Sequence, residues 1–153
     1  MNPVFEIIDY EPRYKSELLA ISLPWLEEHD ILEPADIEQL EHPERTLATG
    51  GRIFLARVGE EIVGMMMLEL FGDGTCEPFK FGVKEPWRNR GIGHALMDAT
   101  LAAARELGQH TAVLTSHHSL TAALHIYESY GFEHQDHDHV AFELSDISMK
   151  LTL

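Results

Sequence analysis

The 153-residue chain contains one cysteine, few basic residues and no long apolar run. The single cysteine, Cys76, excludes an intrachain disulfide and suits a reducing compartment. The chain has no uninterrupted run of about eighteen apolar residues and no basic, apolar leader, so nothing in it predicts export or a membrane partner. From these absences we expect a cytoplasmic protein.

Basic residues are scarce: 11 lysines and arginines stand against 26 aspartates and glutamates, which gives a formal net charge of −15. A nucleic-acid partner needs clustered Lys and Arg against its phosphates, so this balance argues against one. A negative surface steers cationic molecules toward a protein, although the same charge can serve solubility alone. The length and an apolar fraction of 44% predict a single domain over residues 1–153 with a sizeable core.

The hydrophobic pattern changes twice between residues 79 and 108. Residues 79–83 (FKFGV) are a short apolar run typical of a strand, and residues 84–93 (KEPWRNRGIG) are polar, basic and glycine-bearing. Residues 94–108 then repeat apolar side chains at helical spacing and end at Gly108, which fits a helix C-cap. The pattern predicts a strand, a glycine-bearing turn and a helix.

The turn between this strand and this helix is predicted to bind a diphosphate. Amides in the first turn of a helix lack partners and carry the positive end of the dipole, so they bind anions. Gly91 and Gly93 let the backbone approach a phosphate closely, and Arg88 and Arg90 add positive charge. The turn has neither the third glycine of the dinucleotide fingerprint nor the G-K-[ST] ending of a P-loop.

The rest of the chain is predicted as alternating strands and helices. In order, we expect a strand at 4–10, a helix at 13–30 that Pro24 interrupts or kinks, a helix at 32–44 closed before Pro43, strands at 52–58, 61–71 and 75–83, the helix at 94–108, a strand at 111–116, a helix at 119–130 capped by Ser119, and one or two closing strands over 140–146 and 147–153. Pro78 and Gly82 indicate an irregular, bulged strand at 75–83. The strand at 111–116 follows a crossover, so we expect it to run parallel to 79–83.

Two short motifs in this order resemble a known family. Residues 88–93 (RNRGIG) form R-x-x-G-x-G, and residues 127–132 (YESYGF) form Y-x-x-x-G-F. Together they resemble the acetyl-CoA signature of the GNAT superfamily of N-acetyltransferases, and the resemblance covers roughly residues 50–150. It implies a mixed α/β (α+β) GNAT fold: a central twisted, mostly antiparallel sheet of six to seven strands, about four flanking helices, and acetyl-CoA in a cleft between the parallel fourth and fifth strands.

The resemblance also implies residues that bind the cofactor. Main-chain groups of Phe81 and Val83 are expected to pair with the pantetheine arm, as an added strand does. The residues expected around the diphosphate, mostly through their amides, are Arg88, Asn89, Arg90, Gly91, Ile92, Gly93 and His94. His117 occupies the position, ten residues before the motif tyrosine, where the family often has asparagine. Tyr127 is the candidate acid for the leaving thiolate, or else a buried tyrosine whose hydroxyl satisfies a carbonyl.

The transfer also needs a proton acceptor, because the attacking amine must be neutral. Glu77, on the strand that leads to the cofactor, is the candidate base, and Glu69 and Glu33 are its rivals. Each of them can instead be an exposed carboxylate, with protons drained through water. The residues Trp25, Glu27, Glu28, His29 and Glu33 form either part of the acceptor site, with Trp25 and Glu33 binding substrate, or a solvated acidic face around one tryptophan.

The histidine-rich segment near the C-terminus carries potential metal ligands. They are His134, Asp136, His137, Asp138 and His139. Adjacent residues in a turn are poorly placed to close a four-ligand site, so incidental surface histidines are the favoured interpretation. We therefore expect no metal.

The sequence thus predicts an N-acetyltransferase that moves an acetyl group from acetyl-CoA, its co-substrate, to a primary amine by direct attack in a ternary complex. A small cationic metabolite is the expected acceptor, and a protein N-terminus or lysine comes next. A non-catalytic acyl-CoA-binding or sensing module on the same fold is the alternative from another class. The chain is also compatible with a homodimer.

Overall fold

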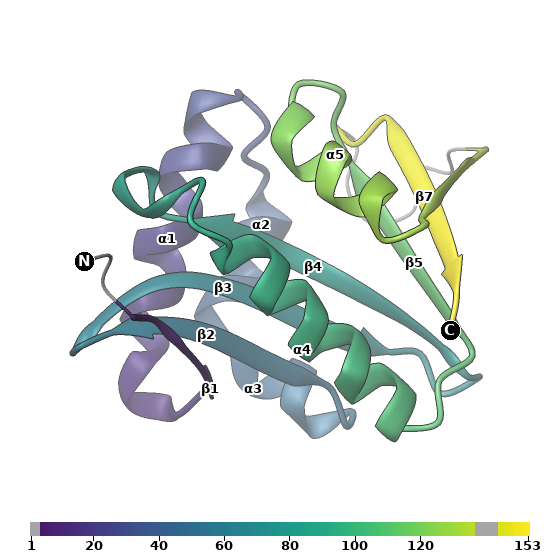
Figure 1. The fold of residues 1–153 in the computed structure, drawn as a ribbon, viewed down its shortest axis with the longest axis horizontal. Coiled ribbons are helices and arrows are strands. Elements are labelled where there is room, and N and C mark those ends of the chain that lie inside the picture. The colour runs from purple at the N-terminus through teal and green to yellow at the C-terminus, as the bar shows by residue number, and fades with distance from the viewer. Residues whose placement is uncertain (1–3, 137–143) are drawn as a thin grey trace.

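Figure 1 shows the computed structural model, which describes residues 4–136 and 144–153. Its strands form one sheet in the order β1-β2-β3-β4-β5-β7-β6. The strands are β1 (Glu6–Asp9), β2 (Arg52–Val58), β3 (Glu61–Leu70), β4 (Thr75–Val83), β5 (Thr111–Ser116), β6 (Glu133–Gln135) and β7 (Ile147–Thr152). Only β4 and β5 pair in parallel within this described part, so the predicted mixed, mostly antiparallel sheet is confirmed.

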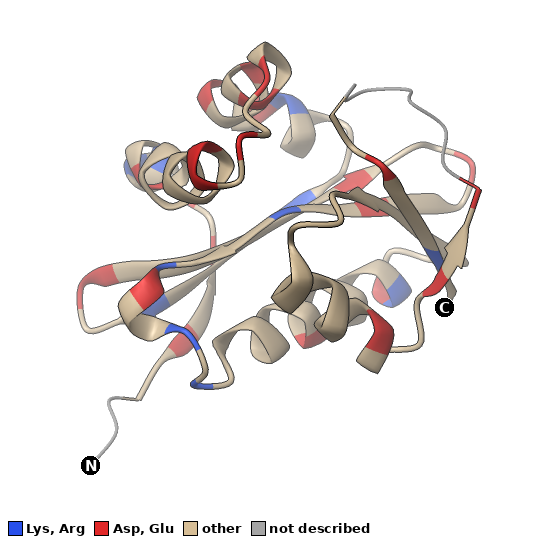
Figure 2. Ribbon diagram, turned by 90° about the horizontal axis from the view of Figure 1, so that it is seen from above, with Lys and Arg blue, Asp and Glu red and all other residues tan. Residues whose placement is uncertain are grey.

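The helices lie in two layers, one on each face of the sheet (Figures 1 and 2). They are α1 (Lys15–Glu28), α2 (Pro34–Glu41), α3 (Pro43–Ala48), α4 (Ile92–Glu106) and α5 (Thr121–Ser129), with 3-10 turns at Pro12–Tyr14 and Glu85–Trp87. The first three cover one face, and α4 and α5 cover the other. Within the described residues, no helix has the length and apolar character needed to cross a membrane.

The sheet separates two hydrophobic cores, and β3 contributes to both. Successive side chains of a strand point to opposite faces. Met66 and Leu68 accordingly pack in the core beneath α4 and α5, while Met65 and Met67 pack in the core beneath α1. All four side chains are fully buried. The methionine run, Met65 to Met67, is thus part of both cores.

β4 is irregular, which confirms the predicted bulge. Its register against β3 shifts between Met65 and Met67, and Lys80 has a φ of 53°. A left-handed backbone is uncommon for a residue with a side chain, and a bulge of this kind sharpens the twist of a strand. At Gly82, a Cβ atom would lie 2.7 Å from the Trp25 Nε1 atom, so glycine allows the indole to pack directly on the strand.

β4 and β5 pair over only a short length before they separate. The parallel register joins Thr75 to Thr111 and Cys76 to Ala112, and within the described strands it extends no further. Cys76 is fully buried at this junction. Burial, followed by the charge of Glu77, raises the pKa of its thiol to about 11, so it is an inert core residue. Beyond it the two strands diverge (Figure 1), as the prediction of a cleft between them requires.

Two helix predictions need correction in part: Pro24 does not interrupt its helix, and a further helix follows the second one. α1 continues through Pro24 to Glu28. Pro24 and Ala20, the residue whose carbonyl loses its helical partner, are both exposed, so water can satisfy that carbonyl. Pro43 ends α2, as expected, but it also opens a third helix that the sequence analysis missed, because proline fits the first position of a helix.

The predictions near the C-terminus also need correction. α5 begins at Thr121 with Leu120 at its N-cap. Ser119 does not cap it, because its hydroxyl and amide engage the Nδ1 atom of His117. Of the strand expected at 140–146, residues 140–143 lie outside the described residues and 144–146 are not a strand. β7 lies between β5 and β6, and β6 is the short strand Glu133–Gln135.

Candidate active site

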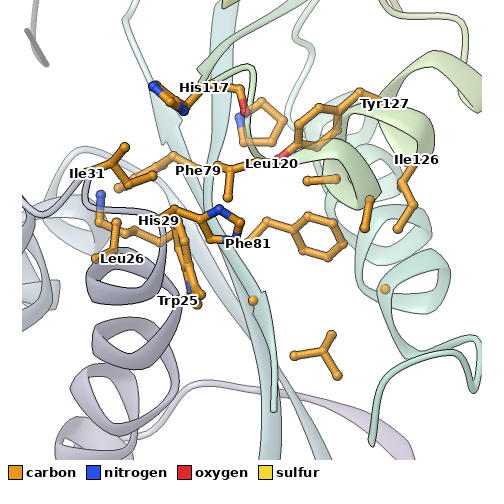
Figure 3. A pocket seen from close by; sticks show the side chains of 18 of the residues that line it. Trp25, Leu26, His29, Ile31, Phe79, Phe81, His117, Leu120, Ile126 and Tyr127 are labelled. Carbon is orange, nitrogen blue, oxygen red and sulfur yellow. The ribbon is translucent and has the colours of Figure 1, made fainter. Parts of the chain in front are cut away.

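A cavity of about 990 Å³ lies where β4 and β5 diverge. Figure 3 shows its walls: Trp25, Leu26, His29 and Ile31 come from α1 and the loop after it, Phe79 and Phe81 from β4, and Leu120, Ile126 and Tyr127 from α5 and its start. The volume is at the upper end of the range of roughly 300–1,000 Å³ that is typical of small-molecule sites. The cavity is therefore large enough for an extended ligand.

One end of the cavity is the first turn of α4. Gly91 is the N-cap, with a φ of 82°, and Asn89 has a φ of 62°. The helical ladder begins when the Ala95 amide donates to the Gly91 carbonyl, so the amides that precede Ala95 are free of helical partners. The residues of the turn that line the cavity are Arg88, Asn89, Gly91, Ile92, Gly93 and His94. The predicted anion-binding turn thus opens into the cavity.

The two glycines of the turn serve different purposes. Nothing lies within 4 Å of a Cβ placed on Gly91, so this position needs glycine for its backbone conformation. A Cβ on Gly93 would lie 2.9 Å from Phe81 Cζ and 3.2 Å from Ile126 Cδ1. Gly93 therefore lets the start of α4 pack against both β4 and α5.

The two arginines of the motif point in different directions. The Nε atom of Arg88 donates to the Val83 carbonyl at 3.0 Å, and both residues line the cavity. The guanidinium of Arg90 lies 5.1 Å above the Trp87 ring and borders a separate hollow beside Phe5. Arg90 is thus the one predicted cofactor-binding residue that does not line the cavity, because a cation–π contact holds it elsewhere.

Tyr127 lies in the wall opposite α1, and its hydroxyl points into the cavity (Figure 3). Its ring contacts Phe81 and Phe132, each at 6.0 Å between centroids. Burial, followed by the charge of Glu77, raises its pKa above the ordinary value, so the hydroxyl keeps its proton at neutral pH. Within the described part of the chain, no hydrogen bond is seen from this hydroxyl.

Glu77 lines the same cavity from β4, directly across from Glu69 on β3. Burial raises its pKa to about 7, against the opposing effects of Lys80 and of the Thr115 amide that donates to it; the charge of Glu69 raises it further. A carboxyl group with this pKa is partly ionised at neutral pH, which is the property of an effective general base.

A family model for the acetyltransferase (GNAT) domain matches residues 49–134, more than half of the chain. The chain belongs to the GNAT family. The matched residues include β4, the anion-binding turn, α4 and Tyr127. Most residues that line the cavity lie in the matched segment, but the wall formed by α1, α2 and the loop between them lies outside it.

Solved structures of similar fold include several acetyltransferases. A GNAT-family acetyltransferase from Staphylococcus aureus Mu50 has a TM-score of 0.88 at 23% identity, over 97% of this chain and 99% of its own. PaiA N-acetyltransferase from Thermoplasma acidophilum, in complex with coenzyme A, has a TM-score of 0.80 at 14% identity, over 98% of this chain and 99% of its own. Ribosomal-protein-alanine N-acetyltransferase from Brucella melitensis has a TM-score of 0.80 at 19% identity, over 97% of this chain and 99% of its own. No curated protein matches the chain significantly. At these identities the likeness shows the fold, and it confirms the predicted GNAT fold.

The GNAT cavity also contains a buried ion pair that the sequence analysis missed. Lys80 Nζ lies 2.6 Å from Asp36 Oδ1, and the two side chains are only 6% and 4% exposed. Asp36 also accepts from the Glu33 amide at 2.8 Å, within a capping box at the start of α2. Burial lowers the pKa of Lys80, and the charges of Asp36 and Glu77 oppose this effect. The only sequence signal was a lysine within the apolar run at 79–83.

The α1–α2 wall brings together some residues of the predicted acceptor cluster. Trp25, His29 and Glu33 line the cavity, whereas Glu27 and Glu28 are exposed outside it. Trp25 Nε1 is buried against Gly82 without a hydrogen-bond partner in the described residues. Glu33 already accepts from the Leu144 amide at 3.1 Å, so it is less suited than Glu77 to the role of base.

His117 follows the end of β5 and lines the cavity. Its Nδ1 atom lies 2.7 Å from Ser119 Oγ, so the loop before α5 orients the ring. Glu69, the other rival base, accepts from Thr49 Oγ1 at 2.8 Å. In the histidine-rich segment near the C-terminus, His134 contacts Glu128 at 3.3 Å, and residues 137–139 lie outside the described residues.

Proposed function

We propose that the protein transfers an acetyl group from acetyl-CoA to the primary amine of a small cationic acceptor, by direct attack within a ternary complex. The observation that carries this proposal is one continuous cavity that joins the open first turn of α4 to Glu77 and Tyr127. Acetyl transfer needs these same parts together: an anion site, a proton acceptor and a proton donor.

The cavity fits acetyl-CoA in its chemistry as well as its size. The free amides at Ile92, Gly93 and His94, together with the left-handed Gly91, suit a diphosphate. The open edge of β4, where β5 has diverged, leaves main-chain groups near Phe81 for an extended pantetheine arm. The bulge also interrupts the pairing of β4 with β3 beside the cavity, where a main-chain amide would suit negative charge on the thioester oxygen.

Glu77 and Tyr127 supply the proton transfers. The amine nitrogen attacks the thioester carbon, the carbon–sulfur bond breaks, the amine proton passes to Glu77, and Tyr127 donates its proton to the departing thiolate. Because the charge of Glu77 raises the pKa of Tyr127, protonation of Glu77 removes that effect. Proton donation by Tyr127 therefore becomes easier at the stage of the reaction that needs it.

The acceptor end of the cavity favours a cation. Its carboxylates are Glu33, Asp36, Glu69 and Glu77. Lys80 is already paired with Asp36, so the remaining charge of this end is negative whenever Glu77 is ionised. Negative charge in a partly closed site attracts a cationic amine, and the Trp25 and Phe79 rings supply apolar contact for its carbon chain.

Two assays test the proposal on the full-length protein. Calorimetry with acetyl-CoA should show binding, and the absence of binding at high micromolar concentration would remove the proposal. A free-thiol assay should then show CoA release with a straight-chain diamine at a kcat/KM about tenfold or more above that of the matching amino alcohol. One additional charge contact is worth on the order of 1–4 kcal/mol in such a site.

The same assays separate the alternatives. Faster thiol release with peptides that have a free N-terminus or lysine than with any small amine would identify a protein acetyltransferase. Cofactor binding without thiol release for every amine would identify a non-catalytic acyl-CoA sensor.

A further inference from the structure

Two histidines and one aspartate meet at the adjoining ends of β5 and β7. Ser116, the last residue of β5, faces Ile147, the first residue of β7, in the antiparallel ladder. The Asp146 amide donates to the Ser116 carbonyl at 3.0 Å, which fixes Asp146 beside His117 and His118. Backbone pairing therefore holds the three side chains together, although 28 residues separate His118 from Asp146.

The three side chains already contact one another. His118 donates its backbone amide to Asp146 Oδ1 at 2.9 Å, and its Nδ1 atom lies 2.5 Å from Oδ2. The rings of His117 and His118 are 4.2 Å apart between centroids. One nitrogen from each ring and one carboxylate oxygen all lie within 4.8 Å of one another.

We propose that His117, His118 and Asp146 bind a divalent transition-metal ion, with Zn²⁺ as the best match. Two imidazoles and one carboxylate are a donor set that zinc takes in tetrahedral sites, with water in the fourth position. An ordinary histidine–aspartate ion pair accounts for the contact between His118 and Asp146. It does not account for the His117 ring, which packs against the His118 ring.

The site needs only small side-chain movements to close. Donors bonded to zinc at about 2.0–2.1 Å in tetrahedral geometry lie about 3.3 Å apart. His118 Nδ1 and Asp146 Oδ2 would separate slightly as the ion replaces the hydrogen between them, and the third donor would move inward. The side chains of His118 and Asp146 are 69% and 42% exposed, so they are free to rotate. To bind through Nε2, His117 gives up the bond that its Nδ1 atom accepts from the Ser119 amide at 3.2 Å and instead donates Nδ1–H to Ser119 Oγ, a support that metal-binding histidines commonly have.

This site differs from the histidine-rich segment that the sequence suggested. The ligands of the proposed site come from two strand ends, whereas those of the segment are neighbours in the chain. It is also independent of acetyl transfer, because the metal takes no part in the proposed reaction. The site adjoins the cavity through His117, which lines both.

Metal binding by the tag-free, full-length protein tests the proposal. Calorimetry with Zn²⁺ should show one ion per chain, and titration with Co²⁺ should give the intense visible bands of a four-coordinate cobalt site. His118→Ala and the nearly isosteric Asp146→Asn should each weaken Zn²⁺ binding by about a hundredfold or more, since loss of a mere supporting contact already costs about 10- to 100-fold. His125→Ala, an exposed histidine on α5, is the matched control and should bind as the unmodified protein does.

A variant with His134, His137 and His139 all changed to glutamine completes the design. It should keep the ion. Loss of the ion in this variant together with its retention in His118→Ala would overturn the proposal, and so would the absence of stoichiometric binding in the unmodified protein. Zn²⁺ should also raise the Tm of the unmodified protein and leave that of His118→Ala unchanged, because a ligand stabilises only the folded form that binds it. An equal rise in both would contradict the assignment.

Discussion

The Glu77→Gln substitution removes a titrating carboxylate from the cavity and leaves the side-chain shape almost unchanged. The new amide oxygen can still accept the hydrogen bond that the Thr115 backbone donates to Glu77. The glutamine cannot take the amine proton. We therefore expect kcat/KM to fall by about 10²- to 10⁴-fold, the usual contribution of a positioned general base, which corresponds to about 3–5 kcal/mol.

The pKa of Glu77 also predicts the direction in which kcat/KM changes with pH. Glu77 acts as a base only when it is ionised, and its pKa is about 7. When kcat/KM is expressed per concentration of neutral amine, it should therefore rise tenfold per pH unit below about 7 in the unmodified protein and level off above it. In Glu77→Gln this limb should disappear, and the residual activity should follow only the ionisation of the acceptor amine.

The same substitution should increase stability at alkaline pH. Folding raises the pKa of Glu77 from its ordinary 4.5 to about 7, so the folded state binds a proton more tightly than the unfolded state does. Stability then falls as the pH rises between these two values, by at most about 3 kcal/mol. Because glutamine carries no charge to bury, the variant should be more stable than the unmodified protein at pH 8.5 and nearly equal to it at pH 4.5.

Urea unfolding at both pH values and thiol-release kinetics over the intervening range test this reasoning. Glu69→Gln is the control: it should keep the acidic limb but shift it to lower pH, because the charge of Glu69 raises the pKa of Glu77. A Glu77→Gln variant that retains the limb would show that another group is the base. A variant that loses activity but gains no stability at pH 8.5 would show that Glu77 is not buried in its charged form.

Three further substitutions test other parts of the site. Tyr127→Phe should lower turnover by about two orders of magnitude or more while leaving acetyl-CoA affinity by calorimetry nearly unchanged; turnover equal to that of the unmodified protein would refute the acid role. Gly93→Ala should weaken acetyl-CoA binding and cost about 1–3 kcal/mol in urea unfolding, because its Cβ would lie 2.9 Å from Phe81 Cζ; unchanged binding would contradict this account of the turn. Lys80→Met should cost about 3–5 kcal/mol by leaving Asp36 buried without its cation, and adding Asp36→Leu should recover most of that loss; an unrecovered double variant would show that the pair is not the cause.

The cofactor end of the cavity was predictable because its parts are contiguous in sequence. Strand, turn and helix follow one another from β4 to α4, so the order of residues alone places the free amides beside the strand. Two features escaped prediction there. The cation–π contact that turns Arg90 away depends on the orientation of a neighbouring ring, and the packing of Gly93 on Phe81 and Ile126 depends on three elements at once.

The acceptor end was less predictable because its residues converge from distant segments. Asp36 and Lys80 are 44 positions apart in the sequence. In the sequence alone, Asp36 is explained as a helix-capping residue and Lys80 as a charged residue within a strand. Only the packing of α2 over the β4 bulge joins them. Pro24 shows the same limit, because whether proline interrupts a helix depends on the exposure of a carbonyl one turn earlier.

Burial and the buried ion pair act in opposite directions on the pKa of Glu77. Lys80 is the cation of the acceptor end, and its bond to Asp36 at 2.6 Å holds it at one position behind β4. From there its charge lowers the pKa of Glu77, but this effect is smaller than that of burial, so the pKa comes to rest at about 7. If Lys80 paired with Glu77 directly, the carboxylate would be held ionised and would be a weak base. We therefore propose that Asp36 supports the reaction at a distance, because by pairing with Lys80 it would leave Glu77 basic enough to accept the amine proton.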